Sequence, residues 1–231
     1  NLIVKGMVTE LEAEFIDNLV VQDDSENTND TVTIALSSCL GNTDGVTTVT
    51  IGPDATDDYA TINECLDVLK SSGICGPIEV EIKQGTYNEQ LVISDIAGLS
   101  AENYIVFKGE DSAEQTIITY TPTSNADNDA KYVLNLDSVS NIIFQDLTIS
   151  ITDTTTSFVI DVNHSENITF NQMTFATPHS VTPDLFKVRN TNNITFTNNN
   201  FYGSSNQIKS EDAITTLNIN NNKFYDFGTT A

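Results

Sequence analysis

Short runs of alternating apolar and polar residues recur along the chain from about residue 130 onward. Copies of one phrase begin at Asn141, Asn167, Asn193 and Thr216, so that successive copies lie 26, 26 and 23 residues apart. In each copy the apolar residues alternate with polar ones, which is typical of a β-strand that buries one face. The sequence therefore predicts a fold built from a repeated unit of short strands.

When the copies are aligned, their apolar residues fall into columns. The clearest columns are Ile142, Ile168, Ile194 and Leu217, then Phe144, Phe170, Phe196 and Ile219, and then Ile149, Phe175, Phe201 and Phe224. One copy cannot bury its apolar face alone, whereas stacked copies place like residues about 4.8 Å apart in a common core. We therefore expect an all-β fold, a right-handed parallel β-helix (solenoid) with three short strands and three bends in each coil. A solenoid of paired helices would need apolar residues at helical spacing, which the copies lack.

Asparagine is concentrated where one strand of the repeat gives way to the next. Residues 198–200 and 220–222 are both runs of three asparagines. Asparagine tolerates left-handed backbone angles, and stacked asparagine side chains bond to one another in ladders. The pattern predicts an asparagine-rich corner that continues from coil to coil.

The predicted β-helix spans residues 46–231 and begins with a strand at residues 46–51. Asp57-Asp58 then opens a segment whose apolar residues have helical spacing, and Gly73 is a typical helix end. The apolar residues of this segment are Tyr59, Ile62, Cys65, Leu66 and Leu69. We expect an N-terminal capping helix here, closing one end of the core.

Residues 1–45 have a different pattern, with short apolar runs at residues 2–8, 15–21 and 31–36 separated by acidic, polar turns. Two interpretations stay open: the end of a preceding β-sandwich module, or an irregular N-terminal cap. At the other end, residues 224–231 carry neither a helix nor a polar cap, and an uncapped β-helix exposes strand edges. We therefore expect the β-helix to continue beyond the C-terminus, as a covalent part of a longer polypeptide.

The net charge of the chain limits the kinds of molecule that it can bind. The chain has 9 Lys+Arg against 33 Asp+Glu, for a net charge of −24. Such a balance argues against nucleic acid as a partner, and equally against anionic membranes or polymers unless calcium bridges the charges. No apolar run approaches the roughly 20 residues that span a bilayer, so we expect no membrane insertion.

Three cysteines are an odd number, so at most one intramolecular pair forms. Cys65 and Cys75 both fall at the predicted N-terminal end of the β-helix, and we expect a disulfide between them. The other two pairings stay open, as does the interpretation of all three as small buried residues.

Two phrases resemble the opening of pectin-lyase-like β-helix proteins. They are Asp58-Tyr-Ala-Thr-Ile-Asn-Glu64, which leads into the predicted helix, and Gly85-Thr-Tyr-Asn-Glu89, which follows it. Residues 73–78, 85–90 and 132–148 resemble more closely the β-helix modules of very large secreted proteins of Bacteroidetes. The resemblance covers about residues 46–231 and implies a secreted or cell-surface protein, but one such fold carries many functions.

The residue sets of the enzymes in that family have no match. The paired Asp, paired Gln and Arg of pectin methylesterases are not found in this sequence, nor is the "G-H-G" phrase of polygalacturonase-type hydrolases. Asp161, Asp184, Lys187 and Arg189 do fall in one region of adjacent predicted coils. Acid–base chemistry is one interpretation of this cluster, but ion pairing between coils is sufficient to explain it.

Two further sets of residues are candidate binding sites. Asp54, Asp57 and Asp58 could supply oxygen ligands to calcium, although the spacing of an EF-hand loop is missing. Tyr202 and Tyr225 are candidates for stacking against sugars, because the chain has no Trp. No cofactor is expected, apart from this possible use of calcium.

These observations favour a non-enzymatic extracellular module, structural or adhesive, within a larger cell-surface or secreted protein. The alternative is a carbohydrate-active β-helix, resembling a polysaccharide lyase, hydrolase or esterase, or a glycan-binding module. The expected partners are an extracellular polysaccharide or another surface protein.

Overall fold

A computed structural model describes residues 2–4, 32–34, 39–121, 131–151, 158–177, 184–203 and 207–225. The chain divides into two compact units, Asn1–Ser38 and Cys39–Ala231. In the first unit, β1 (Leu2–Val4) pairs antiparallel with β2 (Val32–Ile34). Both strands fall within predicted runs, whereas the run at residues 15–21 lies outside the described residues. The two interpretations of residues 1–45 stay predictions.

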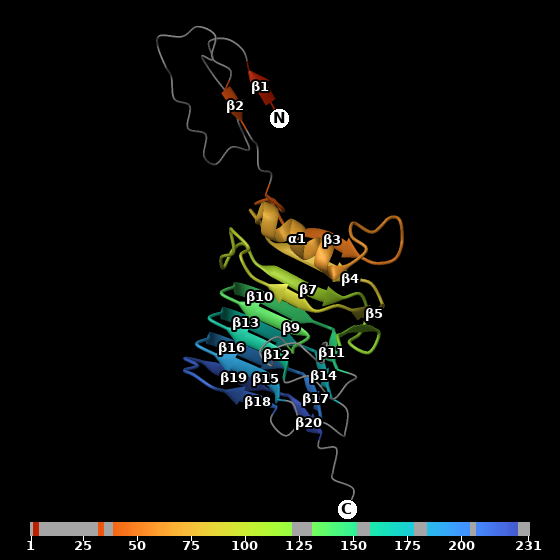
Figure 1. Ribbon diagram of the computed structural model, residues 1–231, viewed down its shortest axis with the longest axis vertical. Coiled ribbons are helices and arrows are strands. Elements are labelled where there is room, and N and C mark those ends of the chain that lie inside the picture. Colours follow the sequence, from red (N-terminus) through yellow and green to blue (C-terminus); the bar gives the residue numbers. More distant parts are fainter. Residues whose placement is uncertain are drawn as a thin grey trace, which may run out of the picture. The chain divides into compact units, whose positions relative to one another are not determined.

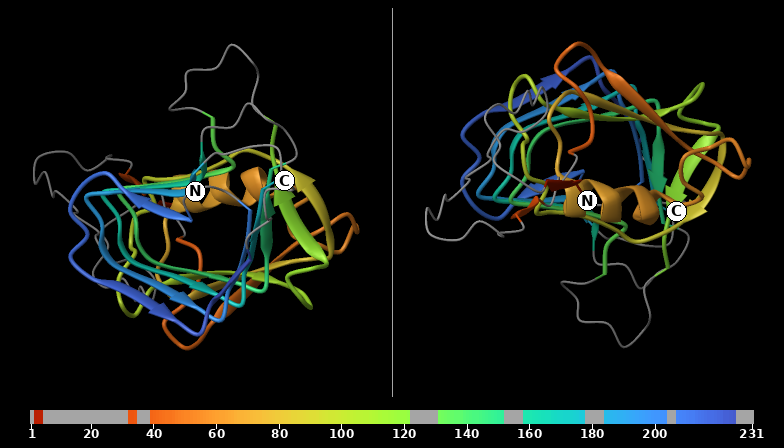
Figure 2. Two further views of the ribbon diagram at one scale, coloured as in Figure 1. Left: turned by 90° about the horizontal axis from the view of Figure 1, so that it is seen from below. Right: turned by 90° about the horizontal axis from the view of Figure 1, so that it is seen from above.

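The second unit winds through three parallel sheets (Figure 1). The seven-stranded sheet contains β3 (Thr47–Ile51), β4 (Ile78–Ile82), β7 (Ile105–Gly109), β10 (Ser140–Gln145), β13 (Glu166–Asn171), β16 (Asn192–Thr197) and β19 (Leu217–Asn220). The six-stranded sheet contains β5 (Gly85–Asn88), β8 (Thr116–Thr119), β11 (Thr148–Ser150), β14 (Thr174–Ala176), β17 (Asn200–Tyr202) and β20 (Lys223–Tyr225). The five-stranded sheet contains β6 (Leu91–Ile93), β9 (Leu134–Asp137), β12 (Phe158–Asn163), β15 (Asp184–Arg189) and β18 (Ile208–Ser210). Viewed along the stack, the three sheets enclose a common core, so the predicted β-helix is confirmed (Figure 2).

The predicted columns set the register between coils. Ile142 pairs with Ile168, which pairs in turn with Ile194, and the neighbouring phenylalanines follow the same order. The rings of Phe144, Phe170 and Phe196 are stacked, with centroids 5.2–5.3 Å apart. Because each strand repeats the same inward residues, one continuous apolar stack forms the core.

Asparagine ladders run along the bends, as predicted. Asn198 and Asn221 have left-handed backbone angles, and the amide of Asn221 donates to Oδ1 of Asn198. A second ladder lies at the start of strands β10, β13 and β16 of the seven-stranded sheet, where Asn193 donates to Asn167 (2.8 Å) and Asn167 to Asn141 (3.3 Å). Both ladders link neighbouring coils through side chains in addition to the backbone.

The capping helix α1 (Ile62–Ser72) begins later than the sequence indicated. Thr61 is its N-cap, and the Thr61 and Glu64 side chains form a capping box. This box fixes the start, so Asp57 and Asp58 lie in the preceding turn. The helix buries Ile62, Cys65, Leu66 and Leu69, and it ends at Gly73, where φ is 68°. No helix in the described parts of the chain is long and apolar enough to cross a membrane.

The phrase Gly85-Thr-Tyr-Asn-Glu89 attaches the helix to the next coil. One Glu89 oxygen accepts the backbone N–H of Ile62 (3.1 Å), and the other accepts that of Asn63 (2.9 Å). The Tyr87 hydroxyl donates to the carbonyl of Lys83 (2.9 Å). A carboxylate at a helix N-terminus satisfies donors that have no partner within the helix.

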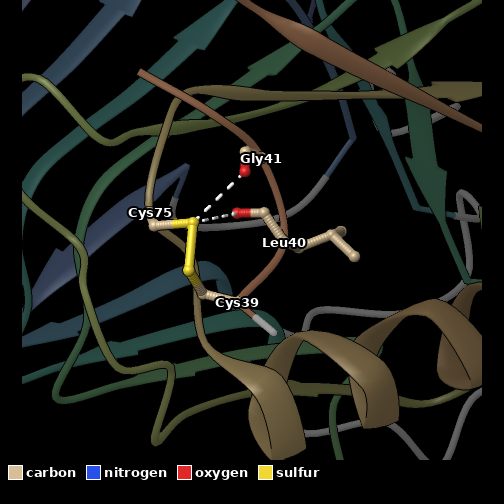
Figure 3. The surroundings of a disulfide bond; sticks show 4 residues. All are labelled: Cys39, Leu40, Gly41 and Cys75. Carbon is tan, nitrogen blue, oxygen red and sulfur yellow. Dashed lines mark hydrogen bonds between the residues drawn. A yellow bond between two sulfur atoms is a disulfide. The ribbon is translucent and has the colours of Figure 1, made fainter. Parts of the chain in front are cut away.

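The disulfide joins Cys39 to Cys75, and the predicted Cys65–Cys75 pair is wrong (Figure 3). Residues 39–41 fold back against the loop after α1, where the N–H of Leu40 donates to the carbonyl of Gly73. Cys65 lies on the buried face of the helix and is a free thiol. Burial, with a smaller contribution from the charge of Asp58, raises the pKa of Cys65 to about 12.

Candidate functional site

The outer face of the five-stranded sheet carries two rows of polar residues across successive coils. Leu134, Leu136, Ile160 and Val162 point into the core, so the positions between them face outward. The first row consists of Asn135, Asp161, Lys187 and Lys209, which are register partners from β9 to β18. The second row consists of Asp137, Asn163 and Arg189. The strand register therefore brings charged and amide groups of different coils side by side.

Asp161 is the buried member of this face, at 1% exposure. Its Oδ2 atom accepts from Arg189 Nη2 at 2.6 Å and from Asn135 Nδ2 at 3.2 Å. Moving a carboxylate out of water costs several kcal/mol unless a partner compensates for the lost hydration. The guanidinium and the amide are thus held in fixed positions by a buried anion.

The lysines of this face are also paired with carboxylates. Lys187 lies 3.4 Å from Glu211, and Lys209 lies 3.2 Å from both Asp184 and Glu211. Hydrogen bonds to Glu211 and Asp184 raise the pKa of Lys209 above its usual value. Partial burial works to raise the pKa of Glu211, but the bonds and charges of Lys209 and Lys187 outweigh it and lower that pKa.

An aromatic pair lies beside the charged row. The rings of Tyr132 and Phe158 are stacked with centroids 6.2 Å apart, and Lys187 Nζ lies 5.0 Å from the centre of the Phe158 ring. Burial, then the nearby charge of Asp161, raises the pKa of Tyr132. The Tyr132 hydroxyl therefore stays neutral at physiological pH and can both donate and accept hydrogen bonds.

The predicted cluster of Asp161, Asp184, Lys187 and Arg189 does lie on one face, with Asp161 and Arg189 in direct contact. The register partners of Asp161 are Asn135 and Lys187, neither of which is a carboxylic acid. Glycoside hydrolysis and related acid–base chemistry generally use two carboxyl groups flanking the reacting bond. The distances between these side chains therefore show ion pairs between neighbouring coils.

Sequence reasoning missed Tyr132, Phe158 and Asn135. Tyr132 lies two residues before β9, and Phe158 begins β12. They are one coil apart at the repeat spacing of 26 residues, so the alignment of the repeat copies could have found them. Asn135 could have been found, because it lies 26 residues before Asp161 and thus one coil away at the repeat spacing.

Tyr202 and Tyr225 form a single aromatic stack on the six-stranded sheet. They are register partners, and their rings are nearly parallel with centroids 4.4 Å apart. Burial, then the proximity of Tyr225, raises the pKa of Tyr202. Each tyrosine therefore covers one face of the other, and a role of this pair in binding sugars stays a prediction.

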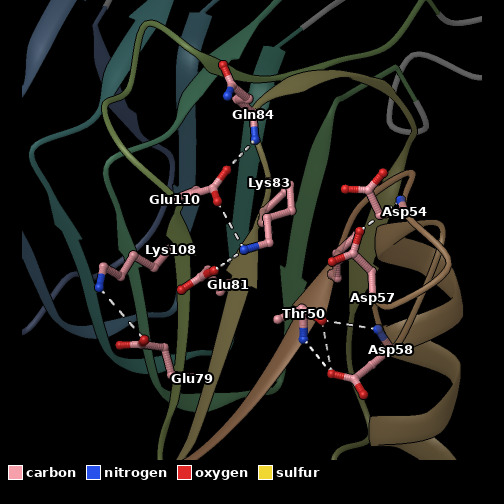
Figure 4. A network of polar contacts seen from close by, with 12 residues as sticks. Thr50, Asp54, Asp57, Asp58, Glu79, Glu81, Lys83, Gln84, Lys108 and Glu110 are labelled. Carbon is pink, nitrogen blue, oxygen red and sulfur yellow. Dashed lines mark hydrogen bonds and ion pairs between the residues drawn. The ribbon is translucent and has the colours of Figure 1, made fainter.

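The acidic turn before α1 uses its carboxylates within the turn (Figure 4). Asp57 accepts the backbone N–H of Asp54 at 3.0 Å, and Asp58 accepts the N–H of Thr50 at 2.8 Å. Within the described ranges, no three or more His, Cys, Asp or Glu side chains gather as a metal-binding group. Calcium binding by Asp54, Asp57 and Asp58 stays a prediction from the sequence.

The sequence matches no protein-family model, and no curated protein matches it significantly. In structure it is similar to a pectin methylesterase solved in complex with a hexasaccharide, with a TM-score of 0.50, 14% identity, and coverage of 79% of this chain and 67% of that one. The pectin methylesterase of Aspergillus niger gives a TM-score of 0.48 at 17% identity, covering 82% of this chain and 68% of the enzyme. That of Erwinia chrysanthemi gives 0.43 at 16% identity, covering 68% of this chain and only 55% of the enzyme.

At such low identity the likeness concerns the fold alone. The neighbours are right-handed parallel β-helix proteins, and the three parallel sheets described above have the same architecture. The described residues of the second unit therefore form a right-handed parallel β-helix.

Proposed function

We propose that this β-helix binds an extracellular polysaccharide through the outer face of its five-stranded sheet. The observation that carries the proposal is the buried carboxylate of Asp161, which orients Arg189 and Asn135 near the partly buried ring of Tyr132, itself stacked on the buried Phe158. Aromatic rings pack against the apolar faces of sugars, while amide, guanidinium and phenol groups bond to their hydroxyls. Asp161 itself is too buried to touch a ligand, so its role is to position its neighbours.

The polar rows are not a requirement of the fold. Val92 of β6 occupies the same register column as Asn135, Asp161 and Lys187, so this position of a coil accepts an apolar residue. A buried ion pair is generally no more stabilising than apolar residues of similar volume. The presence of a buried, paired carboxylate in one later coil, where an earlier coil has an apolar residue, is therefore better explained by binding than by stability.

The spacing of the coils also suits a polymer of sugars. Stacked parallel strands lie about 4.8 Å apart, which is close to the length of one pyranose unit along a chain. Asp137, Asn163 and Arg189 thus offer one polar group per coil along the stack. A polysaccharide lying along the axis would meet a polar group at each coil.

An extracellular location supports the same proposal. The Cys39–Cys75 disulfide ties the start of the unit to the loop after the capping helix. Disulfides of this structural kind persist in oxidising compartments and at cell surfaces, and are rare in the cytosol. A secreted or cell-surface module would meet polysaccharides there.

A structural spacer is the second candidate function, favoured by the asparagine ladder. Side-chain amides link Asn141, Asn167, Asn193 and Asn218 across four successive coils. Such ladders stiffen the stack whether or not its surface binds a ligand. A rigid rod that holds other modules apart would need only this feature.

A glycan and polysaccharide array on the purified chain, read for both binding and product release, tests the proposal. We expect binding without product release, and at least a tenfold loss of affinity in Tyr132→Ala and Asn163→Ala. Thr169→Ala, on the seven-stranded sheet, is the matched control and should bind normally. Circular dichroism spectra of all variants establish that the fold is intact.

Three outcomes would change the conclusion. Unaltered binding in both variants would contradict the assignment to this face, and loss of binding in Tyr202→Ala instead would move the site to the six-stranded sheet. Product release would show that the surface is catalytic. Absence of binding to every polysaccharide would leave the spacer as the function.

A further inference from the structure

The three cations on the outer face of the five-stranded sheet are each paired with a carboxylate. Arg189 contacts Asp161 at 2.6 Å, Lys187 contacts Glu211 at 3.4 Å, and Lys209 lies 3.2 Å from Asp184. Three cations thus meet three carboxylates across neighbouring coils. A ligand arriving at this face meets ion pairs and not a row of unpaired positive charge.

Among the described residues of this face, an anionic polymer would find no cation whose charge is not already neutralised by a carboxylate of the protein. Arg189 bonds to Asp161 through one nitrogen, so its other N–H groups can still bond to a ligand, but its charge is already neutralised by a carboxylate that is 1% exposed. A buried carboxylate that loses its partner is strongly destabilising. In addition, the chain has a net charge of −24, which repels a polyanion at distances within the Debye length of about 8 Å at physiological salt.

The groups that stay available are uncharged. Asn135 and Asn163 each donate one amide N–H to a carboxylate and keep a second N–H and the carbonyl oxygen. Both amides and the Tyr132 phenol are only partly buried. Each of these groups can exchange hydrogen bonds with a hydroxyl without any change of charge. Their chemistry matches the ring hydroxyls of a neutral sugar.

From this pairing we infer that the ligand of the five-stranded sheet is an uncharged polysaccharide, an inference that rests on the proposed function. Selectivity arises because the Asp161–Arg189 pair uses up the cation that a uronic acid would need. Asp161 therefore sets ligand preference without touching the ligand.

Matched polysaccharide pairs test the inference directly. Each pair consists of a uronic acid polysaccharide and its carboxyl-reduced form, taken from several backbones of different linkage, and binding is measured by isothermal titration calorimetry. We expect the reduced form of at least one pair to bind ten times more tightly than the acidic form at low salt. We also expect its affinity to change less than twofold between low and high salt, since no counterions are released.

A charge-swap variant makes the test sharper. Asp161→Asn keeps the shape of the side chain but releases Arg189, and we expect it to improve binding of the acidic form at least fivefold relative to the reduced form. Glu79→Gln is the matched control, because it similarly releases Lys108 on the seven-stranded sheet. This control should leave the preference unchanged.

The failure of the inference differs from the failure of the proposed function. Tighter binding of the acidic forms to the unmodified protein, with an affinity that falls as salt rises or that needs calcium, would overturn the inference while leaving a polysaccharide-binding surface. An Asp161→Asn variant with unchanged preference would also overturn it. Binding of neither form in any pair, or binding that Tyr132→Ala does not weaken, would overturn the proposed function itself.

Discussion

The outer faces of the seven-stranded and five-stranded sheets both carry ion pairs between basic and acidic side chains, but the pairs differ in how deeply they are buried. On the seven-stranded sheet, Lys83 lies between Glu81 and Glu110, and all three side chains are 27–32% exposed (Figure 4). Hydrogen bonds from Lys83 to Glu81, then to Glu110, raise the pKa of Lys83. On the five-stranded sheet the Asp161 side chain is 2% exposed, against 27% for Arg189.

Burial changes what the same pair does. Exposed pairs contribute about 0–1 kcal/mol, because water and salt compensate when they open. A pair with one buried member holds its geometry, because opening it leaves a carboxylate without hydration. The comparison teaches that the energetic role of a charged residue on this solenoid depends on burial more than on its partner.

Removal of Arg189 should give the largest effect. Arg189→Ala leaves Asp161 buried without its cation, and we expect the free energy of unfolding to fall by about 3 kcal/mol. Urea denaturation measures this loss. The double variant Asp161→Val with Arg189→Ala should recover most of it, since Val92 already occupies the same column in an earlier coil. A single variant as stable as the unmodified protein would contradict the comparison.

Substitution of Glu89 should give the second largest loss of stability, because this side chain is partly buried and bonds to the start of α1. Glu89→Ala removes the acceptor of the Ile62 and Asn63 N–H groups, and we expect a loss of about 1–2 kcal/mol. Hydrogen exchange should show the faster opening first in the first turn of the helix. Glu102→Ala, an exposed substitution in a loop, is the control. Equal losses of stability in Glu89→Ala and Glu102→Ala would show that burial does not determine the effect of these carboxylates.

Acid should weaken the Glu211 pairs in a predictable direction. The folded pKa of Glu211 lies below its usual value, so its stabilising effect is complete above the unfolded pKa and is lost as pH falls through the folded pKa. The denaturation midpoint of Glu211→Gln should therefore lie below that of the unmodified protein at neutral pH. The two midpoints should converge below the ordinary range of glutamate. A gap that stays constant with pH would show that the charge of Glu211 is irrelevant.

The smallest effect is expected for Glu110. Hydrogen bonds from Lys83 and from the Gln84 backbone lower the pKa of Glu110, yet the group is exposed. Glu110→Gln should leave the denaturation midpoint unchanged at physiological salt. A clear loss of stability there would mean that exposed pairs matter on this sheet as well.

The repeat made most of the fold predictable. Identical apolar columns in residues 141–224 determine the strand register, because any other alignment would turn core residues outward. The position of Asp161 near Arg189 followed from the same repeat. The function of the face was less accessible, since the burial of Asp161 depends on packing that no local pattern expresses.

The cysteine pairing and the helix start could not be read in the same way. Cys39 reaches Cys75 because residues 39–41 bond to the loop at residues 73–75, a contact over 36 positions without any repeat to announce it. The helix starts at Ile62 because the side chains of Thr61 and Glu64 form a capping box. The attraction of Asp57 and Asp58 to the helix dipole, which predicted an earlier start, is a weaker effect. Nonlocal contacts decided the first case, and competition between local signals decided the second.

The disulfide also determines how the β-helix would respond to a pull. Tension applied through residues 1–38 reaches Cys39 and crosses the disulfide to Cys75, which lies three residues before the start of β4. The bypassed segment, which contains β3 and α1, carries none of that load. Helix α1 would thus stay packed on the core while force acts on the chain. Reduction of the Cys39–Cys75 disulfide would redirect that force through α1.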